Sequence, residues 1–454
     1  MTGSDAGSPL PIAWAGPLKT GSAIGRVGVR VAEALAERGH EVELIATDHE
    51  PVDAAGRIAS GLPVHHWTEV DLAGLAHAYR AVVVNVGDHF FNHGGIFPLL
   101  GHAPCLAVMH DFYLGNLFNG WLWWNGSRPG ARESEVAATY GAGAASWLAR
   151  QQAGVLPLEV EAEHLPMTEW VARRAAGCLA HAGFYVPRLL SACAGPVEVA
   201  GLPMSPRPIA PLAERANDRL RVVTVGVMNA NKCVDRVVEA IAGSPALRAR
   251  TEYRLVGPIA PEEASRLRAR AAAGGWRGLR IDGPASEAEL DAALEAADVV
   301  TCLRRPVLEG ASASLVEALL AGRPTVIADA GCYADTPDDA AVKVPADVPV
   351  PALRAALERL AEDEPERRAL GARARAYAEA RFSLEQYLDV LEPLMAATAR
   401  AGPVLRMSRG LGAGLAALGL GRDDPAVARI AATLAPVFTP AQAPATRPPN
   451  TDAA

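Results

Sequence analysis

The sequence predicts an α/β protein built from two doubly wound domains. Its 454 residues correspond to two or three domains of ordinary size. Short apolar runs alternate with amphipathic stretches, which is typical of a parallel sheet covered by helices. The alternation starts again near Leu220, after the proline-rich stretch Pro203–Asn217, which has no periodicity. We therefore expect an N-terminal domain over 1–205, a linker over 206–217 and a C-terminal domain over 218–398.

In the first domain, the expected strands are short apolar runs without interruption, as strands buried on both faces of a sheet should be. They are Pro11–Ala15, Glu41–Ala46, Ala81–Val86 and Cys105–Met109. A glycine-rich turn follows the first run, and the helical spacing after it predicts a helix over about 27–38.

The second domain repeats this alternation. Its expected strands are Arg221–Val225, Tyr253–Val256, Leu279–Ile281, Val299–Leu303 and Thr325–Ala328. Apolar residues at helical spacing predict a helix over about 234–241 that ends at Gly243. A further helix is expected from Pro261, and Ser286 with Glu289 forms a capping box that opens the next one.

The C-terminal part of the chain changes in composition. The densely charged stretch Glu364–Leu394 predicts one or two surface helices. Residues 399–454 are expected to form an extension, with a Gly/Ala/Leu-rich stretch, a short helix from Pro425 and a disordered Pro/Ala/Thr-rich tail from Pro440.

Composition excludes several classes of function. With 50% hydrophobic and 21% charged residues the chain is globular, and a net charge of −8 argues against a nucleic-acid partner. The six cysteines form no CxxC pair, which fits a reducing compartment. Neither a signal peptide nor an apolar run of membrane-spanning length is present. We expect a cytoplasmic protein, with contact to the inner face of the membrane left open.

The strongest chemical signal is a pair of glutamates eight positions apart, Glu309 and Glu317. The small residues 310–314 between them leave backbone N–H groups at a helix N-terminus uncovered, and such groups bind phosphate. A flanking carboxylate can accept hydrogen bonds from ribose or sugar hydroxyls, so a nucleotide-sugar fits the motif. The alternative is that Ser314 and Glu317 form a capping box and that Glu309 is an ordinary loop carboxylate.

A second signal surrounds Lys232, one of only three lysines in the chain. The segment Val225–Asp235 follows a strand and opens a helix that Asn229 or Asn231 could cap. Lys232 is expected in the first helical turn, where the helix dipole disfavours a cation. We interpret its side chain as reaching an anion in front of the sheet. The alternative is a solvated helix lysine.

Two further features lie at strand ends of the first domain. The glycine-rich turn Gly16–Gly28 would let the backbone approach a ligand, although it does not match the GxGxxG fingerprint and packing alone would also explain it. His110 follows a buried strand, where ligand groups gather in open α/β sheets. It could contact a sugar hydroxyl or move a proton, but a lone histidine at a strand end is more often structural.

Two aromatic or histidine-rich segments carry weaker signals. Leu117–Trp124 is expected as an aromatic loop that either stacks on sugars, contacts lipid or, the interpretation favoured here, packs in the core. Asp88–His93 lacks an evident third ligand, so no metal site is expected there.

Together these motifs resemble family 4 of the retaining glycosyltransferases, over about Pro9–Leu394. Glu309–Glu317 matches the family's E-x7-E motif, and Gly226–Asp235 resembles its donor-phosphate segment with Lys232 at the basic position. The other matching segments are Asp282–Leu290 with Ala297–Asp298 beside the nucleotide base, and Gly21–Arg26 and His110–Asp111 in the donor-facing loops.

The resemblance implies the GT-B fold, in which two Rossmann-like domains face a central cleft with the acceptor on the N-terminal side. It also implies transfer of a sugar from a UDP- or GDP-linked donor, with retention, to an acceptor such as a saccharide, a glycolipid or a small-molecule hydroxyl. The expected partners are therefore a nucleoside-diphosphate sugar and a sugar or lipid-linked acceptor.

By this resemblance, Glu317 would hold the ribose, Glu309 the donor sugar and Lys232 the diphosphate, while His110 would contact the sugar. The catalytic residues would be His110, Lys232 and Glu309. The donor-binding residues would be Gly25, Asn229, Lys232, Gly283, Glu309, Gly310, Ser312, Ser314, Leu315 and Glu317. One departure is Asn229, which stands where family members often have an arginine; Arg304 or Arg305 could compensate.

No metal or other cofactor is expected, because a cation and helix N-termini can stabilise the leaving diphosphate by themselves. Three other functions stay open: a sugar-nucleotide epimerase or phosphorylase on the same architecture, a transferase-like binding protein without activity, and a nicotinamide dehydrogenase. The intact Glu309, Glu317 and Lys232 argue against the binding protein, and the missing GxGxxG argues against the dehydrogenase.

Overall fold

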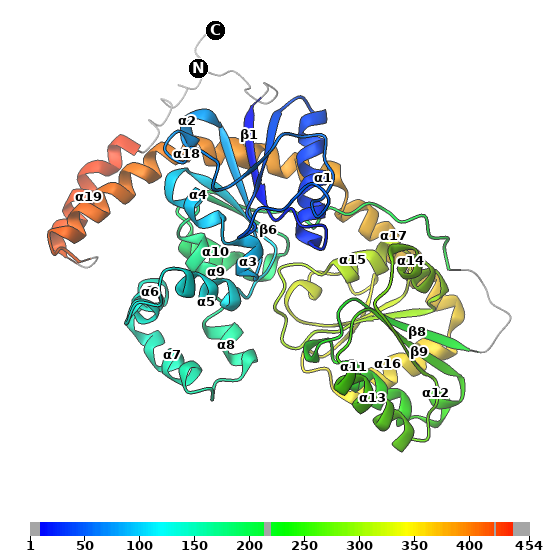
Figure 1. Ribbon diagram of the computed structural model, residues 1–454. Helices are drawn as coiled ribbons and strands as arrows, with labels where there is room; N and C mark the ends of the chain where they lie inside the picture. The colour runs from blue at the N-terminus through cyan, green and yellow to red at the C-terminus, as the bar shows by residue number, and fades with distance from the viewer. Residues whose placement is uncertain (1–9, 213–218, 422–423, 439–454) are drawn as a thin grey trace, which may run out of the picture. The chain divides into compact units, whose positions relative to one another are not determined.

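A computed structural model describes residues 10–212, 219–421 and 424–438. Contacts within the chain define two units, Met1–Ala399 and Arg400–Ala454. The first unit contains two parallel sheets, one in each of its halves, and helices cover both faces of each sheet (Figure 1).

The first sheet has seven parallel strands among the described residues, in the order β3-β2-β1-β4-β5-β6-β7. Their bounds are β1 Pro11–Gly16, β2 Glu41–Ala46, β3 Val64–His66, β4 Ala81–Val86, β5 Cys105–Met109, β6 Gly177–Ala180 and β7 Val197–Val199. All residues of β4 and β5 are buried, as their uninterrupted apolar sequences require. The four strands expected in this half are confirmed.

The helices of this half vary in length from one turn to four. They are α1 Ala23–Glu37, α2 Leu75–Ala78, α3 Phe90–His93, α4 Ile96–His102, α5 Gly115–Trp124, α6 Ala131–Tyr140, α7 Ala145–Gln152, α8 Leu158–His164, α9 Thr168–Ala172 and α10 Val186–Ala192, with short 3-10 turns η1 Ala142–Ala144 and η2 Gly183–Tyr185. Helix α1 begins four residues earlier than expected because Ser22 caps it, its hydroxyl accepting from the N–H of Gly25.

The expectation of a loop at Leu117–Trp124 is wrong, because this segment forms most of helix α5. Its Leu117, Phe118 and Leu122 are buried in the core, whereas Trp123 and Trp124 are exposed. The aromatic segment therefore packs partly in the core, as favoured from the sequence. Its last two rings are exposed, so core packing alone does not describe it.

The second sheet has six parallel strands among the described residues, in the order β10-β9-β8-β11-β12-β13. They are β8 Leu220–Val225, β9 Thr251–Val256, β10 Leu279–Gly283, β11 Val299–Cys302, β12 Thr325–Ala328 and β13 Val342–Val344. The five strands expected here are confirmed, and β13 is an additional edge strand. In both sheets the order reverses beside the first strand, which defines a doubly wound sheet with its switch point at the carboxyl edge.

Helices cover the two faces of the second sheet in separate groups (Figure 1). The elements of this half are η3 Ala230–Lys232, α11 Val234–Ala242, α12 Pro245–Arg250, α13 Pro261–Ala273, α14 Glu287–Ala296, α15 Ala313–Leu320, η4 Gly331–Tyr333, α16 Val350–Glu362 and α17 Glu364–Arg381. The predicted capping box of α14 is confirmed, since Ser286 and Glu289 bond each other's backbone N–H groups.

The last long helix, α18 Leu384–Ala417, returns to the first sheet. Its Leu388, Leu391 and Met395 are buried in one cluster with Ile12 of β1 and Val29 of α1. The stretch Glu364–Leu394 thus forms two helices as expected, but this part of α18 is a core helix of the first half and not a surface helix. The expected domain limit at 398 assigned it to the second half.

Two expectations concern segments that are only partly described. The linker expected at 206–217 lies outside the described residues from 213 onward, and Arg207 within it is held by ion pairs to Asp291 and Glu317. Helix α19, Pro425–Phe438, begins where a short helix was expected, whereas the tail 440–454 lies outside the described residues. Of the helices that the structure describes, none combines the length and the apolarity that spanning a bilayer would require.

Candidate active site

The loop after β11 joins the two halves of the first unit at the carboxyl ends of their sheets. Glu309 pairs with Asp111 in an isolated antiparallel bridge. The N–H of Gly310 donates to the carbonyl of His110 at 2.9 Å, and the N–H groups of Phe112 and Tyr113 both donate to the carbonyl of Leu308 at 2.9 Å. The first glutamate of the E-x7-E segment is therefore fixed directly beside the end of β5.

This close approach explains the glycine at position 310. A Cβ there would lie 2.8 Å from the hydroxyl of Tyr185, 2.9 Å from the carbonyl oxygen of His110 and 3.0 Å from that of Met109. Two of these three atoms are backbone and cannot move aside. Gly310 is thus needed so that residues 303–312 can touch the end of β5; these residues are called the donor loop, because they include the predicted donor-binding residues Glu309, Gly310 and Ser312.

Glu309 is held from two sides. Its Oε1 lies 2.8 Å from Nε of Arg304 and accepts a hydrogen bond from the hydroxyl of Tyr333 at 2.6 Å. Arg304 is itself buried, and its Nη1 also donates to the carbonyl of Leu303. These contacts orient the Glu309 carboxylate, so it is not the ordinary loop carboxylate of the alternative interpretation.

Lys232 is buried, with 5% of its surface exposed, and belongs to the 3-10 turn η3. Its Nζ donates to the carbonyl of Val225 at the end of β8. Burial, and then the charge of Arg304, lower the pKa of Lys232 to about 7. The alternative of a solvated helix lysine is wrong, and so is its placement in the first helical turn.

The reason is the turn between η3 and α11. Cys233 is the residue before α11 and adopts a left-handed conformation with φ of 52°, and no side chain caps this helix. The expectation that Asn229 or Asn231 caps α11 is therefore wrong; Asn229 precedes η3 instead, without a capping side-chain bond. The left-handed Cys233 ends η3 and separates it from α11. Lys232 therefore belongs to η3, and its side chain reaches the carbonyl of Val225 at the end of β8.

Arg304 stands close enough to Lys232 to lower its pKa, and the pKa of Lys232 also responds to Glu309 and Glu317. Arg304 thus interacts with both Lys232 and Glu309 near the carboxyl ends of β8 and β11. Arg305 points elsewhere: its Nε lies 2.9 Å from Oε1 of Glu159. Of the two arginines that could compensate for Asn229, the structure favours Arg304.

Ser312 caps α15, because its hydroxyl accepts from the N–H of Leu315 at 3.3 Å and lies 3.2 Å from the hydroxyl of Ser314. The capping box expected as an alternative for Ser314 and Glu317 is therefore wrong. Oε1 of Glu317 instead lies 2.8 Å from Nη2 of Arg207, with 15% of the glutamate side chain exposed. Burial raises the pKa of Glu317, and Arg207 opposes that rise.

His110 is buried and held through both ring nitrogens. Its Nε2 lies 2.9 Å from Oδ1 of Asn85, and its Nδ1 lies 3.2 Å from Nε2 of His181, whose Nδ1 contacts the carbonyl of Ala200 at 3.0 Å. Burial lowers the pKa of His110 well below its usual value and that of His181 to about 4. Asn85 and His181 therefore fix the orientation of the His110 ring, and burial disfavours its charged form.

Two carboxylates that are not among the predicted catalytic or donor-binding residues follow β4 and β5, the second of which also precedes His110. Asp111 accepts from the backbone N–H of Asp88 at 2.8 Å, and Asp88 accepts from the N–H of Leu117 at 2.9 Å. Burial raises the pKa of Asp88 to about 7 and that of Asp111 to about 6. A usable signal was present, since each aspartate is the second residue after a buried strand, β4 or β5.

The two other predicted glycines have local roles in the structure. A Cβ on Gly25 would collide with the carbonyl of Pro17, so this glycine allows α1 to pack against its own preceding turn. Gly283 has φ of 79° and its carbonyl accepts from the N–H of Gly257 at 2.7 Å. Of the predicted donor-binding residues that remain, Ser312 and Leu315 line a hollow of about 30 Å³ together with His181 from the other half.

A metal site can be tested on the described residues alone. Within the ranges 10–212, 219–421 and 424–438, no group of three or more histidine, cysteine, aspartate or glutamate side chains is arranged to hold a metal ion. Metal independence stays a prediction.

Comparison with known proteins addresses the C-terminal half most directly. Residues 212–377 match the family model described as "Glycosyl transferases group 1". Over this range the chain is similar to the group 1 glycosyltransferases. The matched range contains Lys232, Arg304, Glu309 and Glu317, and the expectation of a glycosyltransferase is confirmed at the level of this domain. No curated protein matches the chain.

Solved structures extend the likeness to most of the chain. Sucrose-phosphate synthase from Thermosynechococcus elongatus is 16% identical with a TM-score of 0.58, covering 89% of this chain and 99% of that one. HepE from Anabaena in complex with UDP is 14% identical with a TM-score of 0.58, covering 85% and 99%. An α,α-trehalose-phosphate synthase (UDP-forming) from Burkholderia vietnamiensis is 12% identical with a TM-score of 0.54, covering 87% and 100%. The fold is GT-B, as expected.

Proposed function

We propose that this protein is a retaining glycosyltransferase of family 4, which transfers a sugar from a UDP- or GDP-linked donor to the hydroxyl of a saccharide, glycolipid or small molecule. The observation that carries the proposal is a pair of buried basic side chains, Lys232 and Arg304. Arg304 belongs to the loop that leads into the N-terminus of α15. That geometry suits a diphosphate next to a sugar.

The cations would act on the leaving group. Breaking the bond between the sugar and the diphosphate places negative charge on the diphosphate oxygens, and preorganised charges there stabilise the transition state. Burial of Lys232 is unfavourable to its charge, as its pKa of about 7 shows. A bound diphosphate restores the favourable interaction, so the lysine is prepared to bind an anion.

The two glutamates would hold the hydroxyl groups of the donor. Glu309 is oriented by Arg304 and Tyr333 and would accept from the donor sugar. Glu317 lies eight positions further along the chain, within α15, and would accept from the ribose, with Arg207 fixing one of its oxygens. Between them, the backbone N–H groups of the small residues 311–314 would face the diphosphate.

His110 would face the donor sugar from the first half. Asn85 and His181 fix its ring, and its carbonyl holds Gly310, so the same residue also positions the donor loop. The partly buried acids Asp88 and Asp111 lie nearby and would face the acceptor. No metal or cofactor enters this scheme. A cytoplasmic location, with contact to the inner face of a membrane where the acceptor is lipid-linked, completes the proposal.

The test is a thermal-shift series with UDP, GDP and ADP, because a ligand that binds only the folded state raises stability by mass action. UDP is the first choice, since it occupies the similar structure of HepE. The nucleotide that binds is then tested as its sugar conjugates with and without candidate acceptors. Nucleoside diphosphate release that depends on acceptor supports a transferase. A changed sugar without diphosphate release identifies an epimerase, and no stabilisation by any nucleotide contradicts the proposal.

A further inference from the structure

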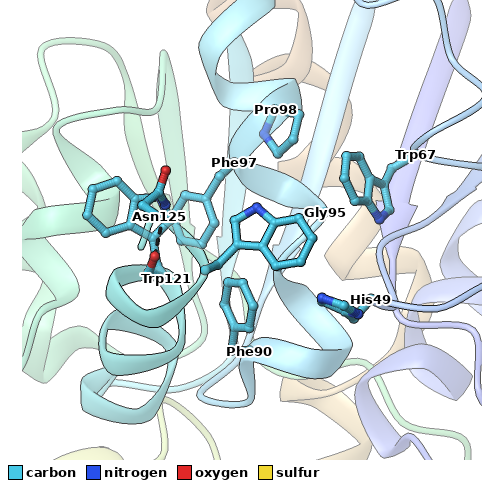
Figure 2. Close-up of a pocket in the computed structure, with 10 residues that line it drawn as sticks. His49, Trp67, Phe90, Gly95, Phe97, Pro98, Trp121 and Asn125 are labelled. Atoms are coloured by element: carbon cyan, nitrogen blue, oxygen red, sulfur yellow. Dashed lines mark hydrogen bonds between the residues drawn. The ribbon is translucent and has the colours of Figure 1, made fainter. Parts of the chain in front are cut away.

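The first half contains an aromatic hollow of about 250 Å³ that the donor site does not use. It lies beyond the carboxyl ends of β2 and β4, and its wall includes helix α5. In Figure 2, the rings of His49 and Trp67 and those of Phe97 and Trp121 border it from opposite sides. We propose that this hollow binds an uncharged sugar ring of the acceptor, an inference that rests on the proposed transferase function.

The lining determines which chemistry can enter. Among the described residues that line it, none is lysine, arginine, aspartate or glutamate. A phosphate or carboxylate group would thus be buried without a partner, which is strongly unfavourable. The volume is below that of pockets for larger organic ligands and suits a single ring. The occupant is therefore a neutral group of about that size.

Aromatic walls alone would also accept an apolar group, but the polar atoms of the hollow favour a sugar. Nε2 of His49 is buried and no described residue forms a hydrogen bond with it. Asn125 at the rim donates through Nδ2 to the carbonyl of Trp121. A sugar ring can present its C–H face to the indoles and its hydroxyls to His49, whereas an alkyl chain would leave His49 unsatisfied.

The position of the hollow connects it to the proposed reaction. The N-terminus of α5 is fixed by the bond from the N–H of Leu117 to Asp88, at 2.9 Å. Asp88 bonds Asp111 through its backbone, and Asp111 pairs with Glu309 of the donor loop. The helix that carries Trp121 and Trp124 is thus attached at one end to the residues around the donor. An acceptor ring bound in the hollow would therefore be linked to the proposed donor site through Asp88 and Asp111.

Two neighbouring tryptophans provide a matched test. Trp124 lines the hollow and is 51% exposed, while Trp123 is 57% exposed and does not line it. Both belong to α5, so substitution by leucine has a similar effect on the helix. A membrane surface would contact Trp123 and the exposed Phe91 at least as well as Trp124.

The experiment measures binding of methyl glucoside, methyl galactoside, methyl mannoside and N-acetylglucosamine by saturation-transfer NMR, with glucose 6-phosphate as the charged comparison. We expect at least one neutral sugar to bind the wild-type protein and Trp123→Leu. Trp124→Leu should weaken this binding about tenfold, and Trp124→Phe should lose less. Asn125→Ala, which removes an exposed rim group, provides a second variant should Trp124→Leu fail to fold.

Three results would overturn the inference: no neutral sugar binds, glucose 6-phosphate binds better than the neutral sugars, or Trp123→Leu loses as much as Trp124→Leu. The last result would instead indicate an aromatic surface for lipid. UDP binding is measured on the same samples. Sugar binding without any nucleotide binding leaves the hollow in place and contradicts the transferase, whereas nucleotide binding without sugar binding does the opposite.

Discussion

The two sheets of the first unit present different chemistry at their carboxyl ends. Behind the loops of the second sheet lie two buried cations, Lys232 and Arg304, with Glu309 oriented between them and the first half. The first sheet presents neutral His110, the acids Asp88 and Asp111 with raised pKa values, and an aromatic hollow. One half is thus suited to a charged nucleotide and the other to a neutral acceptor, although the sheets have the same architecture.

The largest effect is expected for substitution of Lys232 in the second half. Lys232→Ala should lower transfer turnover about 10²- to 10³-fold, because the lysine interacts more strongly with the transition state than with the bound donor. Lys232→Arg should restore only part of the rate, since guanidinium is larger and forked. Steady-state assays of donor-dependent transfer measure both. Lys343→Ala is the control, because Lys343 pairs with the exposed Asp338 and lies outside the segment Val225–Asp235. A loss of less than threefold would move the diphosphate site towards Arg304.

Glu317 tests the nucleotide end of the charged half. Glu317→Ala should weaken nucleotide binding about 10- to 100-fold, the effect of losing a hydrogen bond to a buried charge. Calorimetry with the nucleoside diphosphate measures it. Glu287→Ala removes another partner of Arg207 from an exposed position and should leave affinity unchanged. Unchanged affinity with a lower melting temperature in Glu317→Ala would show that the residue only anchors Arg207.

Gly310 tests the contact that joins the halves. Gly310→Ala forces a Cβ against the carbonyls of His110 and Met109 and should destabilise the fold by about 1–3 kcal/mol, with a matching loss of turnover. Chemical denaturation measures the free energy of unfolding. Gly101→Ala is matched to it, because a Cβ there meets no atom within 4 Å and α4 favours alanine. Equal free energies of unfolding for Gly310→Ala and Gly101→Ala would show that the loop shifts to make room for the added Cβ.

The pKa of Lys232 predicts that nucleotide binding depends on pH. In the free protein this pKa is about 7, and a bound diphosphate raises it. Binding at higher pH therefore takes up a proton, and affinity for a nucleotide sugar should fall by up to about tenfold per pH unit above 7. Calorimetry in buffers of different ionisation enthalpy detects the uptake, which Lys232→Met should abolish. Constant affinity between pH 6.5 and 8.5 would contradict a titrating lysine.

The smallest expected effect is that of chelation. If Lys232 and Arg304 stabilise the leaving diphosphate without a metal ion, the rate of transfer should be unchanged in EDTA. Activity lost in EDTA and regained with manganese or magnesium would mean that the charged half needs an ion as well.

The features that could be predicted from the sequence are those that depend on local patterns of residues. Strands such as β4 and β5 are continuous apolar runs, and the E-x7-E segment is a fixed spacing of small residues and glutamates. The site depends on more than spacing. The burial of Lys232 follows from a left-handed Cys233, a conformation that the residue type does not reveal, and the contact of Gly310 with His110 joins residues 200 positions apart. Long-range packing decides such features.

The same limit applies to α5 and α18. The aromatic sequence of α5 lacks a clear periodicity because it is apolar on nearly all sides, some facing the core and some lining the hollow. Only Phe382 and Ser383 separate α18 from α17 of the second half, and only the fold shows that the first turns of α18 pack on the first sheet. A hydrophobic pattern identifies a buried face without identifying what covers it.

The return of α18 has a consequence for how the protein is made. The first half leaves the ribosome before the second, but its core cluster is completed only by Leu388, Leu391 and Met395. At about 5–20 residues per second, synthesis from Ala200 to Met395 takes roughly 10–40 s. Throughout that interval the nascent first half lacks the residues that cover this part of β1 and α1, so its core can be completed only after the second half has been made.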